Sequence, residues 1–343
     1  MATISDVAKL ANVSKMTVSR VINNSGYVKK ETRTVVLAAI DELHFRPSMI
    51  AKSLVTKQSH VIAHVMLDIS DPFNNLVSRG LEDYCYQHGY ITMICDAHTK
   101  TREQDYINMF IDRNIDGVVI QQLAITQKQV QMLEQAGVMC VLLDNEKDPG
   151  DVYSVNTNHY LGAMMAVDYL ASKGHKRIGC IHGVLKRPEG DNLPYIDTFQ
   201  YSAWQQRTQG FLDSIRNHGL YNGYIYAGNG LEAAAQGCIP PILDSILKTK
   251  NRPTAIYCEN DIMAITLMNA MTERGLKAPD DLAIVGHDGL SLCRILHPYI
   301  TTIGQPRYDM GFKSAAMLIE RLENADVPKT LLLEPKLIAG ETA

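Results

Sequence analysis

Apolar residues recur at three- and four-residue spacing over the first 45 positions, a pattern that predicts short amphipathic helices separated by polar breaks. Three such stretches are expected, at about 4–11, after Ser14 up to position 22, and at 30–44. Ser14 is a residue type that caps helices well, and the polar run 23–26 ends the second stretch. The chain therefore opens with a small all-α unit.

A shorter apolar stretch follows at 48–55, where Ser48 is a suitable cap and Ile50, Ala51 and Leu54 fall on one side. A helix of this length is not stable in isolation. The polar residues 57–59 that follow it predict a linker into the next domain.

From residue 61 the pattern changes to β-branched apolar runs that alternate with amphipathic helices, which indicates parallel α/β structure. The expected strands are 61–67, 90–95, 117–120, 138–142, 178–181, 223–226, 255–258, 282–285 and 301–303. Nine strands with helical crossovers are too many for one tidy sheet, so we expect two doubly wound subdomains. A binding site would then form where the carboxyl ends of the two sheets face each other.

Charge is distributed unevenly along the 343 residues. The whole chain has a formal net charge of −4, which alone argues against a nucleic-acid partner. Residues 1–60, however, contain nine lysines and arginines against four acidic residues, a net charge of +5. A small basic module is thus hidden in an acidic chain, and the net charge of the whole chain does not exclude a nucleic-acid partner.

Seven cysteines lie between 85 and 293 without a C-x-x-C pair, which predicts reduced thiols and a cytoplasmic protein. No apolar run reaches the ~18 residues of a membrane helix, and the N-terminus has no signal-peptide pattern. We expect no metal, no cofactor and no membrane partner.

The segment 3–23, TISDVAKLANVSKMTVSRVIN, has the layout of a helix-turn-helix. Small Ala8 allows the second helix to pack closely, and the polar side chains at the start of that helix face outward. Arginine and lysine can donate to guanine edges, methionine can contact a thymine methyl, and hydroxyls can bind phosphates. A three-helix bundle with a charged face, or a protein-interaction module, is the alternative.

With the following KKETRTVVLAAIDELHFRPSMIAKSL, this segment resembles the amino-terminal region of LacI-family bacterial regulators. The resemblance continues through DISDPF, GYITMICDA, NIDGVVI, GHKRIGCI, QQRTQGF, RPTAIYCENDIMA, APDDLAIVGHDG and TTIGQP, and so covers nearly the whole chain. It implies a helix-turn-helix headpiece at 1–46, a hinge helix and linker at 47–60, and a periplasmic-binding-protein-like core at 61–343. The core would consist of an N-subdomain (about 61–159 and 306–328) and a C-subdomain (about 160–305 and 329–343).

The resemblance also implies roles in DNA binding. It places Lys15, Met16 and Arg20 on base edges, and makes phosphate or backbone contacts of Thr3, Thr17, Ser19 and Asn23, with Ser14 at the cap of the reading helix. In the hinge segment, Ser48 and Ala51 would lie at the DNA and Leu54 would be wedged into a minor-groove base step. By periodicity alone, Leu54 would be core. Two-fold pairing is implied as well, because a homodimer reads a pseudo-palindromic operator with two reading helices.

For the core, the resemblance implies a small-molecule effector, a sugar, held between two lobes by polar side chains and aromatic rings. The positions that match the family's cleft are Asp71, Phe73, Trp204, Arg207, Asn260, Asp261 and Asp288. Arg207 and Asp288 are the strongest candidates, because a cation and a carboxylate from opposite sides suit a polyol. Asp261 could instead cap the helix that begins there.

Three departures from the family pattern bear on the ligand. The segment 184–206 is longer than in the purine-repressor members and holds the only tryptophan, Trp204; it could be a lid over a larger sugar or a surface excursion. Gly230 stands where many relatives carry an aromatic residue, and Thr157 replaces a common aspartate. These changes argue against transferring any relative's ligand directly.

Several alternatives remain open on the sequence. The regulator could respond to a purine or phosphosugar as a corepressor, and the sign of regulation is undetermined. A sugar-acting enzyme fused to a DNA-binding head would need an acid or base such as His64, His182 or His287. No Walker loop, nucleophile elbow or H-E-x-x-H helix supports an enzyme, and a missing signal peptide argues against a secreted transport protein.

Overall fold

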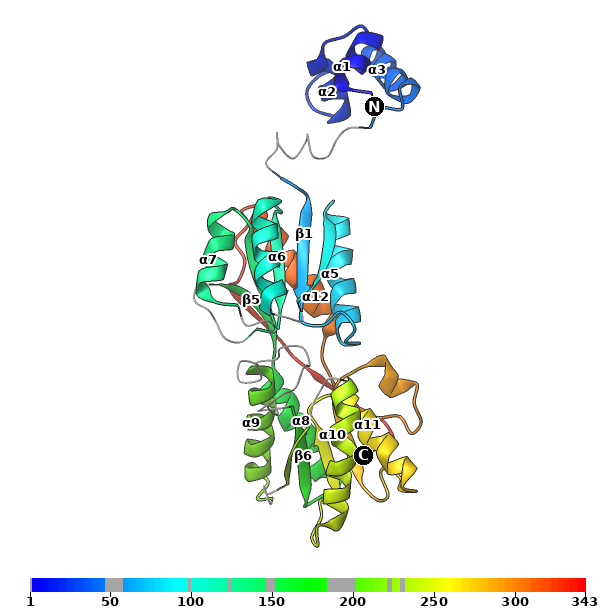
Figure 1. The fold of residues 1–343 in the computed structure, drawn as a ribbon, viewed down its shortest axis with the longest axis vertical. Helices are drawn as coiled ribbons and strands as arrows, with labels where there is room; N and C mark the ends of the chain where they lie inside the picture. The colour runs from blue at the N-terminus through cyan, green and yellow to red at the C-terminus, as the bar shows by residue number, and fades with distance from the viewer. Residues whose placement is uncertain are drawn as a thin grey trace. The chain divides into compact units, whose positions relative to one another are not determined.

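The computed structural model describes residues 2–46, 58–97, 100–122, 125–145, 152–183, 202–220, 224–228 and 232–343. The chain divides into two compact units, Met1–His60 and Val61–Ala343. Both are drawn in Figure 1, and each is described by itself. The hinge segment expected at 48–55, with Ser48, Ala51 and Leu54, lies outside the described residues.

The first unit contains the three expected helices, α1 (Ile4–Leu10), α2 (Lys15–Ile22) and α3 (Lys30–Glu42). Apolar residues from all three are buried in one cluster that includes Val7, Val18 and Val36. Thr3 and Asp6 form a reciprocal capping box that starts α1. The helix-turn-helix layout is therefore confirmed, although α3 ends at Glu42, slightly earlier than the apolar pattern suggested.

The second unit contains two six-stranded sheets. The first has the order β11-β5-β4-β3-β1-β2. Its strands are β1 (Val61–Met66), β2 (Ile91–Asp96), β3 (Gly117–Gln121), β4 (Met139–Leu143), β5 (Tyr153–Thr157) and β11 (Thr330–Leu333). Its helices are α5 (Asn74–Gln87), α6 (Lys100–Asp112), α7 (Gln127–Gln135) and α12 (Arg307–Leu322). All its strand pairs are parallel.

The second sheet has the order β12-β10-β9-β8-β6-β7, with only the β10–β12 pair antiparallel. Its strands are β6 (Ile178–His182), β7 (Ile225–Ala227), β8 (Ala255–Cys258), β9 (Ala283–Asp288), β10 (Thr301–Gly304) and β12 (Lys336–Ile338). The accompanying helices are α8 (His159–Ser172), α9 (Ser202–Asn217), α10 (Glu232–Lys248), α11 (Asp261–Glu273) and the short η1 (Ser291–Arg294). Two doubly wound subdomains are thus confirmed.

Each sheet is covered on both faces, because successive side chains along a strand point to opposite sides. In β1, Ile62 belongs to the cluster that contains α5 and α12, whereas Ala63 belongs to the cluster that contains α6 and α7. In the second sheet, Cys180 packs with α8 and α9, and Ile181 with α10 and α11. This burial on both faces explains why the strands are continuous apolar runs.

The chain crosses between the subdomains three times, at 157–159, 304–307 and 333–336. The second subdomain is expected from the sequence to resume at about 329. Instead β11 pairs with β5 in the first sheet, so the return follows Leu333. All seven cysteines are free thiols, and no described helix has the length and apolar character needed to cross a bilayer.

Helices α5 and α12 lie side by side (Figure 1) because glycine occurs on each where they cross. A Cβ on Gly80 would overlap the carbonyl oxygen of Tyr308, and one on Gly311 would overlap that of Val77. The two backbones are therefore in direct contact. This crossing fixes α12, which follows directly from the second crossover, against the first subdomain.

Candidate DNA-binding and effector sites

The start of α2 presents polar and flexible side chains to solvent. The Ser14 hydroxyl accepts a hydrogen bond from the Thr17 backbone N–H at 3.1 Å and so caps the helix. Lys15 and Arg20 are exposed, and Met16 is 64% exposed, which is unusual for a large apolar residue. Val18 and Val21 face the core instead. Apart from Met16, the outward face of α2 is therefore polar, as the spacing predicted.

The other candidate DNA contacts make local hydrogen bonds within the first unit. The Thr3 hydroxyl donates to Asp6, and the Asn23 amide donates to Ser19 Oγ at 3.2 Å. Ser14 and Thr17 share a hydrogen bond between their hydroxyls at 2.9 Å. Thr3, Ser14 and Asn23 are exposed, and Thr17 and Ser19 are half-buried, so each keeps capacity for a further hydrogen bond to a phosphate.

In the second unit, the loop after β1 is organised by a chain of buried side chains. Asn74 Nδ2 donates to the Asp68 carbonyl at 2.7 Å, and Gln121 Nε2 donates to Asn74 Oδ1 at 2.8 Å. Gln121 Oε1 lies 2.9 Å from His64 Nε2. Because a backbone carbonyl can only accept, Asn74 must donate to it, and this fixes the donor and acceptor in each of the following hydrogen bonds. His64 therefore carries its proton on Nε2. Burial lowers the pKa of His64 to about 4.

The same loop carries Asp71 and Phe73. Asp71 Oδ1 accepts from the Phe73 backbone N–H at 2.8 Å, and burial raises the pKa of the Asp71 carboxyl. Phe73 is buried, with the guanidinium of Arg307 6.0 Å from its ring centroid. Arg307 also donates to the Pro72 carbonyl at 3.4 Å and to the Gly289 carbonyl at 2.6 Å. It therefore ties the loop after β1 to the loop after β9.

Arg207, on α9, lies at the centre of the polar groups between the two sheets. Its Nη1 donates to the Glu259 carbonyl, and its Nη2 lies 3.4 Å from Asp288 Oδ1. Its Nε and Nη2 each lie 3.3 Å from Nδ1 of His159. The guanidinium carbon is 5.2 Å from the ring of Trp204, within cation–π range. The structure thus brings Trp204, Arg207 and Asp288 together.

Asp288 ends β9 with an unusual backbone, φ 125. Its Oδ1 also accepts from Gln305 Nε2 at 2.7 Å. Burial raises the pKa of the Asp288 carboxyl to about 8, although the neighbouring Arg207 opposes the shift.

Asp261 differs from the other predicted contacts. Its two oxygens accept from the Leu290 backbone N–H and from the Thr302 hydroxyl, both at 2.6 Å, and it is completely buried. The alternative role of helix cap falls to Asn260, whose side chain accepts from the Met263 N–H at 2.8 Å. Asp261 therefore pins the loop after β9 with both carboxylate oxygens already bonded to protein groups.

Residues that the sequence prediction did not place in the site complete it. The Glu259 carboxyl accepts from the Thr208 hydroxyl at 2.6 Å and from the Gly183 N–H at 3.1 Å, and burial raises its pKa to about 7. His159 Nε2 lies 2.7 Å from Asp144 Oδ1, at the end of β4. None of these three contacts is visible in local spacing, since the partners are 51, 76 and 15 positions apart.

Among the buried polar atoms that have no protein partner in the described part of the second unit, four lie between residues 157 and 305. They are Thr157 Oγ1, His182 Nδ1, His287 Nε2 and Gln305 Oε1. Thr157, His182 and Gln305 lie at or just after the carboxyl ends of β5, β6 and β10, the edges where a ligand is expected in doubly wound sheets. Unpaired buried groups of this kind are costly unless something else bonds them.

Comparison with known proteins agrees with both parts of this geometry. Residues 3–48 match the family model described as bacterial regulatory proteins of the lacI family, and residues 167–343 match the periplasmic binding protein-like domain. The HTH-type transcriptional repressor PurR of Vibrio vulnificus is 32% identical over 348 residues, which cover 100% of this chain and 98% of that protein.

Solved structures share the fold. A lac repressor dimer bound to operator and an anti-inducer matches with a TM-score of 0.84 at 24% identity, covering 99% of this chain and 98% of the other. The transcriptional regulator CelR in complex with cellobiose matches with a TM-score of 0.71 at 24% identity, over 100% of both chains. With the helix-turn-helix, the two doubly wound subdomains and these full-length matches, the chain belongs to the LacI family of bacterial DNA-binding transcriptional regulators.

Proposed function

We propose that this regulator is a repressor whose affinity for operator DNA is controlled by a neutral sugar, which binds between the strand ends of its two subdomains. The observation that carries the proposal is the set of unpartnered polar atoms of Thr157, His182 and Gln305 near the Arg207–Asp288 pair. Hydroxyl groups both donate and accept, so a polyol can bond such a mixed set. The Trp204 ring would cover an apolar sugar face.

Charge favours a neutral ligand over a phosphosugar. Both arginines near the site, Arg207 and Arg307, already donate to protein carbonyls, and Arg207 is also paired with Asp288. Asp71, Asp144 and Glu259 add buried carboxyl groups close by. An anionic effector would have to be desolvated without a free cation to compensate it. The cellobiose bound by CelR is consistent with a neutral sugar.

A ligand screen tests the effector class. We expect cellobiose or another neutral sugar to raise the unfolding temperature, whereas glucose 6-phosphate and hypoxanthine do not. A hit is then titrated into a DNA-binding assay, because linkage requires that it change operator affinity by the factor by which operator changes its own. Stabilisation only by the phosphosugar or only by the purine would contradict the proposal. Recovery of the sugar unchanged separates regulation from catalysis.

For DNA recognition, we propose that Lys15, Met16 and Arg20 contact bases, while Thr3, Ser14, Thr17, Ser19 and Asn23 bind the phosphate backbone. The support is the exposed face of α2 and the +5 charge of residues 1–60. Ser48, Ala51 and Leu54 would contact the minor groove from the hinge segment. A protein that reads operators acts on the chromosome, which places it in the cytoplasm at the nucleoid.

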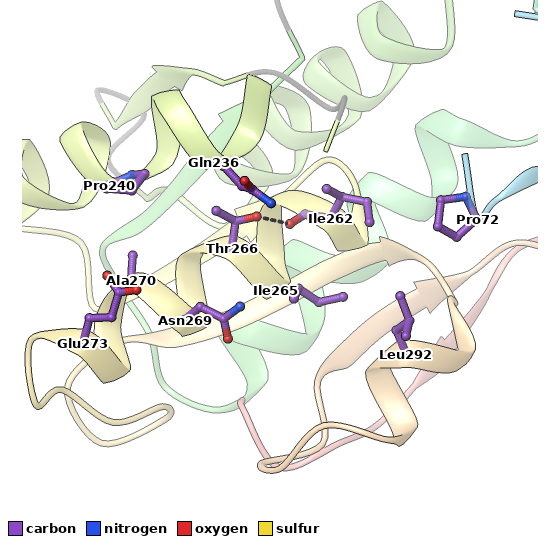
Figure 2. A pocket seen from close by; sticks show the side chains of 10 residues that line it. All are labelled: Pro72, Gln236, Pro240, Ile262, Ile265, Thr266, Asn269, Ala270, Glu273 and Leu292. Carbon is purple, nitrogen blue, oxygen red and sulfur yellow. Dashed lines mark hydrogen bonds between the residues drawn. The ribbon is translucent and has the colours of Figure 1, made fainter. Parts of the chain in front are cut away.

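We further propose that the protein forms a homodimer. A groove of about 490 Å³ runs between α10 and α11 and is bordered by Pro72 and Leu292 (Figure 2). Large apolar side chains are also exposed in the loop after β1, on α5, on the edge strand β2 and in and after η1. They include Ile69, Leu76, Ile91, Ile94, Leu292 and Ile295. Uncovered apolar surface on this scale favours association, and a two-fold pair matches a palindromic operator.

The dimer is tested by Leu292→Lys in the full-length protein. In a two-fold symmetric interface, the introduced lysine would be buried close to the same lysine of the partner copy, and the two charges would repel. We therefore expect the dissociation constant of the dimer to rise at least ~10-fold above that of the wild type. Sedimentation equilibrium measures it. Ile225→Lys is the matched control, since Ile225 is similarly exposed but lies on β7, away from the groove. Equal effects of both changes would contradict this interface.

A further inference from the structure

A buried histidine links a carboxylate of the first subdomain to the central arginine of the second. His159 starts α8, directly after the first crossover, and Asp144 follows β4. His159 Nε2 lies 2.7 Å from Asp144 Oδ1, and its Nδ1 lies 3.3 Å from both Nε and Nη2 of Arg207. His159 and Asp144 have no exposed side-chain surface. The histidine therefore has a different partner on each ring nitrogen.

The position of the ring proton follows from the chemistry of the two partners. A guanidinium has only donors, so Nδ1 of His159 must accept and carries no hydrogen. The proton of the neutral ring is then on Nε2, from which it is donated to the Asp144 carboxylate. Burial lowers the pKa of His159, and Arg207 adds to this effect while Asp144 opposes it. A protonated ring would turn a second N–H, with positive charge, toward the guanidinium.

The other charged and titratable groups around His159 also favour a neutral ring between the Asp144 carboxylate and Arg207. Asp144 also accepts from the Thr157 backbone N–H at 3.1 Å and from Gln122 at 3.2 Å. Although burial raises the pKa of Asp144, His159, the Thr157 N–H and Arg207 hold it below its usual value. The His287 ring centroid is 6.2 Å from that of His159, and burial keeps the pKa of His287 well below the ordinary range. On its far side, Arg207 meets Asp288.

We propose that His159 is a positioning residue for effector recognition, which as a neutral imidazole holds Arg207 in place against the Asp144 end of the first sheet. The assignment rests on the proposed function only in taking Arg207 as an effector contact. Because Thr157 and His159 both bond Asp144, the same contact fixes the first crossover between the subdomains. Protonation of His159 removes one acceptor that orients Arg207, and leaves the guanidinium held only by the Glu259 carbonyl and Asp288.

The chain contains its own reporter for this event. Trp204 is the only tryptophan, and its ring stacks within 5.2 Å of the Arg207 guanidinium carbon. Displacement of Arg207 changes the polarity around the indole, so tryptophan emission follows the position of the arginine. The experiment is a pH titration of full-length protein from pH 8.5 to pH 5 without any added effector or DNA, with emission recorded at each step.

Two substitutions separate positioning from simple structural support. His159→Gln keeps one donor and one acceptor but does not titrate, and His159→Ala removes both. We expect an emission change on acidification of the wild type, its loss in His159→Gln, and an already altered emission at pH 8.5 in His159→Ala. Glu259, His182 and Asp288 also titrate near Trp204 or Arg207. Because all three remain in His159→Gln, the difference between the two profiles belongs to His159.

His218→Gln serves as a matched control. His218 Nε2 lies 2.8 Å from Asp168 Oδ1, which is another histidine–aspartate pair, but an exposed one. We expect the tryptophan emission of this variant to change with pH as that of the wild type does. The proposal is overturned if His159→Gln retains the wild-type profile, or if His159→Ala has wild-type emission at pH 8.5. Since no effector is present, a failed ligand screen leaves this result unaffected, and the two failures are distinguishable.

Discussion

The guanidinium of Arg207 and the carboxyl of Asp288 face each other across 3.4 Å, with both side chains almost completely buried. One comes from helix α9 and the other from the end of strand β9. Such a pair is costly to bury unless its remaining groups are bonded, and here they are, by His159, Gln305 and the Glu259 carbonyl. Other protein groups therefore hold both members of the pair.

Replacing Arg207 by lysine should weaken effector binding strongly. Lysine keeps the charge but cannot bond His159, Asp288 and a carbonyl at once, because its three donors share one nitrogen. Loss of a charged hydrogen bond corresponds to about 1.5–3 kcal/mol, or roughly 10- to 100-fold in affinity. Calorimetric titration with the sugar identified by the screen measures the change.

The control for this substitution is Arg216→Lys, on the same helix, where Arg216 is exposed and paired only with Asp213. It should bind the sugar as the wild type does. If Arg207→Lys also retained wild-type affinity, Arg207 would not be an effector contact.

The carboxyl of Glu259 should make the stability of the second unit depend on pH. Its pKa is about 7 in the folded protein against an ordinary value of 4.5, because burial favours the neutral form. A raised pKa contributes stability that is fully present below pH 4.5 and is lost as pH rises through about 7. Glu259→Gln lacks this term but keeps a donor and an acceptor for Thr208 and Gly183.

Between pH 5 and pH 8, the wild type should therefore lose ~1–3 kcal/mol relative to Glu259→Gln. Thermal unfolding followed by Trp204 emission at several pH values measures the difference. Glu273→Gln, at the exposed end of α11, should run parallel to the wild type. If the stability of Glu259→Gln changed with pH as that of the wild type does, the Glu259 carboxyl would have its ordinary pKa.

Alanine substitutions at two glycines, one at the crossing of α5 and α12 and one on α10, should have opposite effects on stability. Gly311→Ala places a methyl group on the Val77 carbonyl and must push the helices apart, at a cost of about 1–3 kcal/mol or more. Gly237→Ala, in the exposed part of α10, meets no neighbour and should stabilise by about 0.5–1 kcal/mol. Thermal unfolding by circular dichroism compares them; destabilisation by both would point to backbone effects alone.

Sequence-selective DNA binding should depend on Lys15 and Arg20. Their replacement by alanine removes ~1–3 kcal/mol of base discrimination for each bidentate contact, and should abolish operator preference before general affinity for DNA. Fluorescence anisotropy with operator and random duplexes at a fixed salt concentration separates the two. Equal losses on both duplexes would assign these side chains to the phosphate backbone instead.

Much of the fold can be predicted from the sequence because the elements are defined by local patterns. The three helices of the first unit follow from apolar spacing, and the strands of the doubly wound sheets are continuous apolar runs because both faces are covered. Three strands were not predicted, β5, β11 and β12. β11 and β12 are short edge strands with exposed positions, and β5 alternates polar and apolar residues, so none has that apolar signal.

The sequence alone determined most of the helical and extended segments and, through its resemblance to a family, singled out Arg207 and Asp288. Only the tertiary structure decided that Asp261 turns inward to Leu290 and Thr302, and that Asp144, His159 and Arg207 form one chain between the subdomains. The reason is physical. Secondary structure is encoded by neighbours in sequence, whereas the partner of a buried polar group is chosen by the packing of elements far apart along the chain.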